Sequence, residues 1–440
     1  MQFSFSKNTL LIFLPLAITL CFSCGSGNKD KNVTTSEEIV IHDTIEIASL
    51  EENSEEEVIV MGADSYENYL PLLQNKKVGV VANQTSRMST AIFPHLEMRD
   101  ANGVDIPIEN YHLVDFLVEI DINVLKVFAP EHGFRGKADA GETVKDGKDA
   151  KTGLPIISLY GKNKKPTPEQ LEGIGIMIFD IQDVGVRFYT YIATMHLVME
   201  ACAEAGIPVI ILDRPNPNGH YIDGPMMEKE HTNFLGMHPV PLVHGMTVGE
   251  YAQMINGQGW LANGIQCDIK VVPMRNYNHE TPYSLPVRPS PNLPNDVAIN
   301  LYPSLGLLEG TNLSAGRGTE MQFQVIGSPH LPTQFYPFTY TPQPNFGSKY
   351  PKHQGKVCNG LDLRNTPKMS RADLSWIVDA YTSHANKESF FNTANFTAHA
   401  GTTKLQEQIE KGYTFREIRK TWLRELQAYD KMRQPYLIYD

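Results

Sequence analysis

Four short polar segments hold the residues of this 440-residue chain that are best suited to chemistry. They span residues 83–85, 131–136, 180–187 and 213–219, and each directly follows an apolar run. Together they hold carboxylates, amides, arginines and a histidine. Apolar runs of this length are typical of strands buried in a parallel sheet, and ligands bind beyond the carboxyl ends of such strands. We therefore predict that the four segments form one site.

Glu131 is the strongest candidate for a catalytic acid among these residues. Three apolar residues precede it, and His132 and Arg135 follow it. Gly133 and Gly136 predict a tight turn, because glycine adopts backbone conformations that other residues avoid. A tight turn aims the carboxyl group in one direction, which a surface glutamate in an ordinary loop does not require.

The sequence lacks the motifs that bind common cofactors and metals. No GxGxxG follows the first apolar run, and GxxxxGK[ST], HExxH and GxSxG do not occur. Isolated histidines such as His132 and His244 are more often hydrogen-bonded loop residues than metal ligands. We therefore predict carboxylate chemistry with no cofactor and no metal ion.

The elements that must position these residues are predicted from the pattern of apolar runs. Helical stretches separate the runs, and they begin at N-capping signals such as Thr167 and Thr247. This alternation predicts an α/β domain with a doubly wound, mainly parallel sheet over residues 61–288. The expected strands are 78–82, 125–129, 156–159, 174–179 and 208–212.

The character of the sequence changes at about residue 289. Proline and asparagine become dense and the alternation is lost, while helical patterns return at 370–383 and 414–430. One face of the last helix is apolar and needs a partner. We therefore predict a smaller α+β auxiliary domain over residues 289–440, packed on the first.

The N-terminus predicts export and lipid attachment. Lys7 precedes an apolar run from Thr9 to Phe22, which is too short to span a bilayer comfortably and which ends close to Cys24. We interpret residues 1–24 as a bacterial lipoprotein signal peptide with Cys24 as the acylated residue. The alternative is an ordinary cleaved signal peptide that happens to hold a cysteine.

Residues 25–60 are predicted to form a disordered acidic tether, since they contain ten acidic residues and two lysines with little apolar surface. The rest of the chain has no basic stripe, so nucleic acid is excluded as a partner.

Cys202, Cys267 and Cys358 lack metal-ligand spacing and are interpreted as buried free thiols. In a secreted protein, carboxylates with aromatic and arginine side chains indicate a sugar substrate. Glycoside cleavage needs an acid and a second group that stabilises an oxocarbenium-like transition state.

Six ordered segments, taken together, resemble the motifs of the exo-β-N-acetylmuramidases. The resemblance runs from about residue 65 to the C-terminus. It implies a Rossmann-like domain with a C-terminal auxiliary domain and a cleft between them. It also implies release of N-acetylmuramic acid from the non-reducing ends of peptidoglycan fragments, with Glu131 as the catalytic residue. The segments are 78–86, 128–136, 180–191, 213–217, 244–250, and 309–314 with 316–320.

The second catalytic group stays open at this point. Asp180, Asp183 or Glu320 could be a second carboxylate, or the 2-acetamido group of the substrate could be the nucleophile. An arginine could pair with the lactyl carboxylate that distinguishes muramic acid from glucosamine, because a guanidinium matches a carboxylate with two hydrogen bonds. The three candidates for this pairing are Arg187, Arg214 and Arg317. The predicted substrate-binding residues are Asn83, His132, Arg135, Arg187, Tyr189, Arg214, Asn216, His244, Asn312 and Arg317.

Two other functions compete with a glycosidase. A lipoprotein that binds muropeptides without cleaving them would also need a cleft and a tether, and a metal-assisted deacetylase would also act on cell-wall sugar. The glycine-framed acid at Glu131 disfavours the first, and the missing ligand spacings disfavour the second. In each case we expect the chain in the cell envelope, lipid-anchored, in the periplasm or outer membrane of a Gram-negative bacterium.

Overall fold

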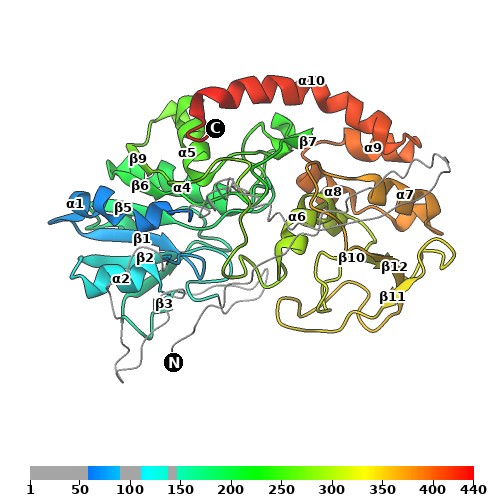
Figure 1. Cartoon of the computed structure of the whole chain (residues 1–440), viewed down its shortest axis with the longest axis horizontal. Coiled ribbons are helices and arrows are strands. Elements are labelled where there is room, and N and C mark those ends of the chain that lie inside the picture. Colours follow the sequence, from blue (N-terminus) through cyan, green and yellow to red (C-terminus); the bar gives the residue numbers. More distant parts are fainter. Residues whose placement is uncertain (1–57, 90–110, 137–145) are drawn as a thin grey trace, which may run out of the picture. The chain divides into compact units, whose positions relative to one another are not determined.

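The computed structural model describes residues 58–89, 111–136 and 146–440 (Figure 1). The predicted signal peptide with Cys24 and nearly all of the predicted tether lie outside these described residues. The described residues all belong to one structural unit, so their sheets and helices can be placed relative to one another.

A seven-stranded sheet forms the first part of this unit, and all of its strand pairs are parallel except the one made by β3 at the edge. The five predicted strands are confirmed as β1, β2, β4, β5 and β6. The order across the sheet is β3 (Gly147–Lys148), β4 (Pro155–Ser158), β2 (Val124–Ala129), β1 (Val78–Ala82), β5 (Ile176–Asp180), β6 (Val209–Leu212) and β9 (Ile269–Val272).

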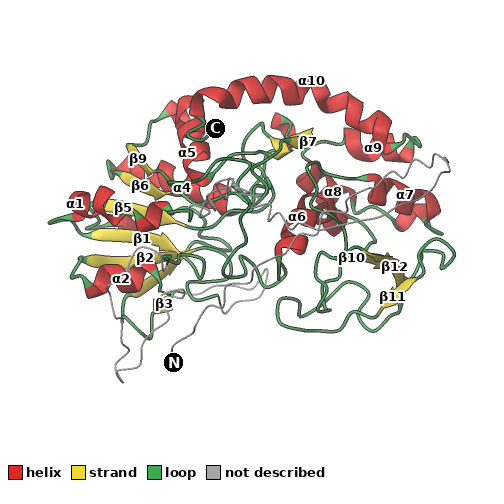
Figure 2. Ribbon diagram, viewed as in Figure 1, coloured by secondary structure: helices red, strands yellow, loops and turns green. Residues whose placement is uncertain are grey.

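Helices cover both faces of this sheet (Figure 2). Successive residues of a strand point to opposite faces, so Val81 and Phe179 join the core on one side while Val80 and Ile178 join the core on the other. The first core includes α4 (Tyr191–Ala205) and α5 (Val248–Gly257), and the second includes α1 (Leu70–Leu73) and α2 (Leu113–Glu119). The predicted doubly wound α/β class is therefore confirmed.

The side of β1 on which the chain adds strands to the sheet changes before β5. From β1 the chain adds β2 and β4 on one side, and it then returns to the other side of β1 to add β5. Ala82 at the end of β1 pairs with Asp180 at the end of β5, so the segments that follow leave the sheet at the same level. Such a reversal opens a crevice at the carboxyl ends of the strands.

The predicted helix signals are largely confirmed. Thr167, Thr247 and Thr414 each form a capping box, and Gly206 ends α4 in the left-handed conformation with φ 68°. The helix at Thr167, α3 (Pro168–Leu171), has only one turn. α4 begins at Tyr191, because the preceding residues form a turn closed by a bond from the Tyr189 N–H to the Val186 carbonyl.

The second part of the unit is a smaller α+β region, as predicted. A hairpin of β7 (Asp223–Met226) and β8 (Pro241–Val243) precedes it, and α6 (Asp296–Leu305) opens it. A three-stranded antiparallel sheet has the order β10-β12-β11. The remaining elements are β10 (Val325–Ser328), β11 (Phe338–Tyr340), β12 (Cys358–Asp362), α7 (Ser375–Ser383), α8 (Thr393–Ala400), α9 (Lys404–Glu410) and α10 (Phe415–Arg433).

Helix α10 joins the two parts. Figure 1 shows it running from α9 back to α5. Its predicted apolar face is buried, and the Tyr429 hydroxyl donates to the His244 carbonyl at 2.7 Å. Cys202, Cys267 and Cys358 are buried and free, as expected. Within the described ranges, no helix combines the length and the apolar character needed to cross a bilayer.

Candidate active site

The turn that follows β2 presents Glu131 at the carboxyl edge of the sheet. His132 has φ 69°, Gly133 has φ 73° and Gly136 has φ 69°, all in the left-handed region. A non-glycine residue such as His132 pays about 1–2 kcal/mol for this conformation, so the surrounding structure must hold it there. A Cβ atom on Gly136 would lie 2.9 Å from Cβ of Gln84. The glycine-shaped turn predicted from the sequence is therefore present, and Glu131 is half-buried on it.

Two tyrosines flank Glu131. The Tyr160 hydroxyl donates to Glu131 Oε1 at 3.4 Å, and the Tyr191 hydroxyl donates to the Glu131 carbonyl at 3.5 Å. Burial, together with the nearby Glu131 carboxylate, raises the pKa of Tyr160 to about 12, so this phenol keeps its proton at neutral pH. The sequence analysis missed Tyr160. Its position two residues beyond β4, the neighbour of β2 in the sheet, is the signal that points to it.

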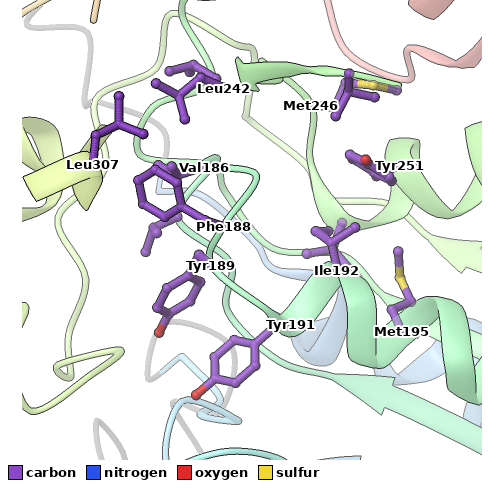
Figure 3. Packing of buried hydrophobic residues seen from close by; sticks show 14 of the residues in the cluster. Val186, Phe188, Tyr189, Tyr191, Ile192, Met195, Leu242, Met246, Tyr251 and Leu307 are labelled. Carbon is purple, nitrogen blue, oxygen red and sulfur yellow. The ribbon is translucent and has the colours of Figure 1, made fainter. Parts of the chain in front are cut away.

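A layer of three tyrosines extends the site toward the C-terminal region. The ring of Tyr189 lies 4.9 Å from that of Tyr191 and 6.1 Å from that of Tyr302, a residue of α6 that the sequence analysis also missed. In Figure 3, the hydroxyls of Tyr189 and Tyr191 point to the same side, away from Met195. The Tyr189 hydroxyl donates to the Pro289 carbonyl at 2.7 Å.

Charged groups surround this tyrosine layer, and they are the ones that act electrostatically on Tyr302. Burial raises its pKa, and the charges that act on it are Arg317, Glu309, Glu131 and Asp183. Glu131 and Asp183 follow β2 and β5 of the large sheet, whereas Glu309 and Arg317 belong to the C-terminal region. Both parts of the unit therefore contribute charged groups that act on Tyr302.

Asp183 is buried beside His244. Its Oδ2 accepts from the Gly185 N–H at 2.6 Å and lies 3.4 Å from His244 Nε2. Because His244 Nδ1 accepts from the Met246 N–H at 3.3 Å, a neutral His244 holds its proton on Nε2, facing Asp183. Oδ1 of Asp183 has no hydrogen-bond partner among the described residues. Oδ1 of Asp183 is therefore an acceptor without a donor in the described part of the chain.

Asp180 and Arg214 form a buried ion pair with two hydrogen bonds. Arg214 Nε donates to Asp180 Oδ1 at 2.6 Å and Arg214 Nη2 donates to Oδ2 at 2.9 Å, with side-chain exposures of 2% and 0%. Burial raises the pKa of Asp180, and the guanidinium of Arg214 opposes this effect. The geometry argues against the hypotheses that Asp180 is the second carboxylate and that Arg214 binds the lactyl group, because neither group can face a substrate.

Arg187 is likewise used inside the protein. Its terminal nitrogens donate to four backbone carbonyls, those of Pro225, Val240, His399 and Ala400, at 2.7–3.1 Å. Arg187 is buried, so the hypothesis that it binds the lactyl carboxylate is also disfavoured.

Four other predicted binding residues have clear structural partners. Arg135 pairs with Asp115 at 2.9 Å and with Asp149 at 2.7 Å. The side chains of the three asparagines are hydrogen-bonded to the loops around them. Asn83 accepts from Thr85, Asn216 donates to the Met246 carbonyl and accepts from Asn218, and Asn312 accepts from Ser328.

The remaining candidates differ in where they lie. His132 is buried next to Glu131, and Arg317 is partly exposed beside Tyr302 and Glu309. Glu320 is exposed, and it is not among the charges that act on the tyrosine layer. Of the candidates, Glu131, Asp183 and Arg317 are therefore those whose charges all act on Tyr302.

A separate cavity of about 370 Å³ lies between α6 and the 282–284 segment. Its lining includes Asp296, Asn300 and Lys368, but neither Glu131 nor Asp183. No group of three or more His, Cys, Asp or Glu side chains in the described part of the chain is arranged to hold a metal ion. We place the chemistry at Glu131, because carboxylates and tyrosines from both parts of the unit converge there.

A half-buried glutamate on a strained turn, with phenols and a second carboxylate beside it, defines a hydrolase of the α/β class that acts through acid groups. Models of the N-terminal and C-terminal parts of the exo-beta-N-acetylmuramidase NamZ match residues 78–297 and 300–439. The chain therefore belongs to the exo-β-N-acetylmuramidase family and is a glycoside hydrolase.

Known proteins resemble the chain over most of its length. The peptidoglycan beta-N-acetylmuramidase NamZ of Bacillus subtilis (strain 168) is 39% identical over 396 residues, which cover 84% of this chain and 89% of that protein. Two crystal structures of DUF1343 family proteins from Bacteroides fragilis NCTC 9343 each cover 87% of this chain and 99% of their own. Their TM-scores are 0.77 and 0.72, at 40% and 26% identity.

Asp180→Asn tests whether the buried pair is structural. Removal of one partner leaves the charge of Arg214 buried and uncompensated, so we expect the free energy of unfolding to fall by about 3–5 kcal/mol in urea denaturation. Asp362→Asn is the matched control, because Asp362 pairs with Arg364 on the surface and its loss should leave stability unchanged. An Asp180→Asn protein with wild-type stability and no hydrolysis would instead make Asp180 catalytic.

Proposed function

We propose that this chain is an exo-acting glycoside hydrolase that releases N-acetylmuramic acid from the non-reducing end of peptidoglycan fragments. Membership of the exo-β-N-acetylmuramidase family and the similarity to the peptidoglycan beta-N-acetylmuramidase of Bacillus subtilis support this substrate. The observation that carries the proposal is the position of Glu131, half-buried on a strained turn between two phenols.

In the proposed reaction, Glu131 is the general acid that protonates the oxygen of the departing sugar. A phenol that stays protonated at neutral pH, Tyr160, donates to Glu131 Oε1 and orients the carboxyl group. The half-buried ring of Tyr302 provides apolar surface against which a sugar ring can pack, and the buried rings of Tyr189 and Tyr191 support it from behind.

Asp183 is the best placed of the candidates for the second catalytic group. Its charge raises the pKa of Tyr191 and of Tyr302, as the charge of Glu131 does. One of its oxygens has no hydrogen-bond partner among the described residues. That oxygen can stabilise positive charge at the anomeric carbon, or accept from the N–H of a 2-acetamido group that attacks this carbon. Glu320 is less suitable because it is exposed and lies outside this group of charges.

Glu131→Gln tests the proposal directly. The amide keeps the shape of the side chain but cannot donate a proton in the same way, so we expect release of free N-acetylmuramic acid from a MurNAc–GlcNAc disaccharide to fall by about 10²–10⁴-fold. Glu320→Gln, an exposed glutamate changed in the same way, should retain the wild-type rate. The proposal fails if the wild type releases no sugar, and equal rates for Glu131→Gln and the wild type would place the acid elsewhere.

We also propose that the enzyme works in the cell envelope, attached to a membrane by a lipid on Cys24. The apolar run that ends close to Cys24 and the acidic segment that follows support this location. Such a tether would let the catalytic unit reach cell-wall fragments while the lipid holds it at the membrane.

Cys24→Ala tests the anchor. We expect the wild-type chain, expressed in a Gram-negative host, to sediment with membranes and to incorporate a labelled fatty acid, because the thiol is the acceptor of the lipid. The alanine variant should lose both properties. A wild-type chain that is found in the soluble periplasmic fraction without label would contradict the anchor and leave an ordinary signal peptide.

A further inference from the structure

Three of the four arginines predicted to bind substrate use their terminal nitrogens for contacts inside the protein. Arg135 is shared between two carboxylates, Arg187 between four carbonyls, and Arg214 is paired with Asp180. A buried guanidinium whose hydrogen bonds are already made loses more than it gains by turning to a ligand.

Arg317 differs from these three. Its Nε donates to Glu309 Oε1 at 2.6 Å, and its two terminal nitrogens have no acceptor in the described part of the chain. The side chain is 26% exposed. The edge of the guanidinium that can bind a carboxylate with two parallel hydrogen bonds is therefore available.

The charge around Arg317 also favours an anion. Lys352 Nζ donates to the carbonyls of Leu308, Thr311 and Leu313 at 2.9, 2.6 and 2.9 Å, which uses the three N–H groups of an ammonium. Burial opposes the ionisation of Glu309, yet Arg317 and Lys352 hold the pKa of this carboxyl below its usual range. Two cations, Arg317 and Lys352, therefore act on the Glu309 carboxylate.

The backbone holds Arg317 in place. Phe323 has φ 53°, a left-handed conformation that a bulky residue adopts only under constraint. Its ring lies 5.1 Å from Cζ of Arg317 and 4.8 Å from the ring of Tyr302. A Cβ atom on Gly318 would lie 2.5 Å from Cβ of Pro351, so the Arg317 loop packs tightly against the segment that holds Lys352.

A chain of side-chain contacts links Arg317 to Glu131. Phe323, next to Arg317, packs on Tyr302, and Tyr302 is joined through Tyr189 to Tyr191, whose hydroxyl donates to the Glu131 carbonyl. If Glu131 protonates the oxygen on carbon 1, the same ring can direct a carboxylate on carbon 3 toward Arg317. The lactyl group of muramic acid is such a carboxylate.

We propose that Arg317 binds the lactyl carboxylate of the sugar in the site and thereby selects N-acetylmuramides over N-acetylglucosaminides, with Glu309 and Lys352 holding the guanidinium in position. This inference rests on the proposed function, since it names the residue that reads the substrate of the same site. Glu309 fixes one edge of the guanidinium, and Lys352 supplies the charge that makes a second carboxylate favourable there.

The test combines a change in the protein with the matching change in the substrate. The substrates are 4-nitrophenyl β-N-acetylmuramide, its lactyl methyl ester, and 4-nitrophenyl β-N-acetylglucosaminide. We expect esterification to lower kcat/KM of the wild type by about 10- to 100-fold, the usual effect of losing a charge-assisted pair. For Arg317→Met the same esterification should have no further effect, because the partner of the carboxylate is already absent.

Arg364→Met is the matched control variant. Arg364 also donates through Nε to a carboxylate, that of Asp362 at 2.9 Å, and its Cζ lies 6.0 Å from the ring of Phe338. Arg364→Met should therefore discriminate between acid and ester as the wild type does. Arg317→Lys, which keeps the charge beside Glu309, guards against loss of folding and should discriminate less well than the wild type, because an ammonium lacks the planar fork.

Two results would overturn the inference. One is an equal penalty for the ester in the wild type and in Arg317→Met, and the other is a wild type that cleaves the acid and the ester equally well. Calorimetric titration of both proteins with free N-acetylmuramic acid and its methyl ester separates this inference from the proposed function. An inactive wild type that still binds the acid through Arg317 would refute the function and uphold the inference.

Discussion

The buried guanidinium of Arg187 is the interaction on which the rest of the site depends. It bonds on one side to the carbonyls of Pro225 and Val240 around the β7–β8 hairpin, and on the other to those of His399 and Ala400 at the end of α8. One side chain therefore links the two parts of the catalytic unit. The next residue, Phe188, packs against the C-terminal region beside Leu307 in Figure 3. Because this guanidinium is buried and both of its terminal nitrogens bond across the junction, the two parts are held together around the site.

The site divides its tasks between these two parts. The large sheet contributes the acid–base groups that follow its strands β2 and β5, on either side of β1. The C-terminal region contributes Tyr302 and the cluster of Arg317, Glu309 and Lys352, which favours an anion. The groups proposed for acid catalysis therefore come from the large sheet, and those proposed to recognise muramic acid come from the C-terminal region.

Local signals predicted the framework well, and long-range pairings could not be predicted. The strands, the capping boxes and the turn at Glu131 depend on neighbouring residues, which a single sequence displays. Whether a polar residue at a strand end bonds to substrate or to protein depends on its partner, and the partner of Arg214 is 34 residues away while those of Arg187 include carbonyls more than 200 residues away. Tyr160 and Tyr302 were missed for the same reason, since only the folded sheet and α6 bring them to Glu131.

The central claim is that Glu131 protonates the departing oxygen, and the most direct measurement is the dependence of rate on the leaving group. A series of aryl β-N-acetylmuramides with phenols of graded acidity would be compared in the wild type and in Glu131→Gln. If Glu131 is the general acid, the variant should lose most with the most basic leaving groups and approach the wild-type rate with 2,4-dinitrophenol, which departs without a proton. A loss of the same factor across the whole series would contradict the claim, because Glu131 would then act on binding or shape and not on proton transfer.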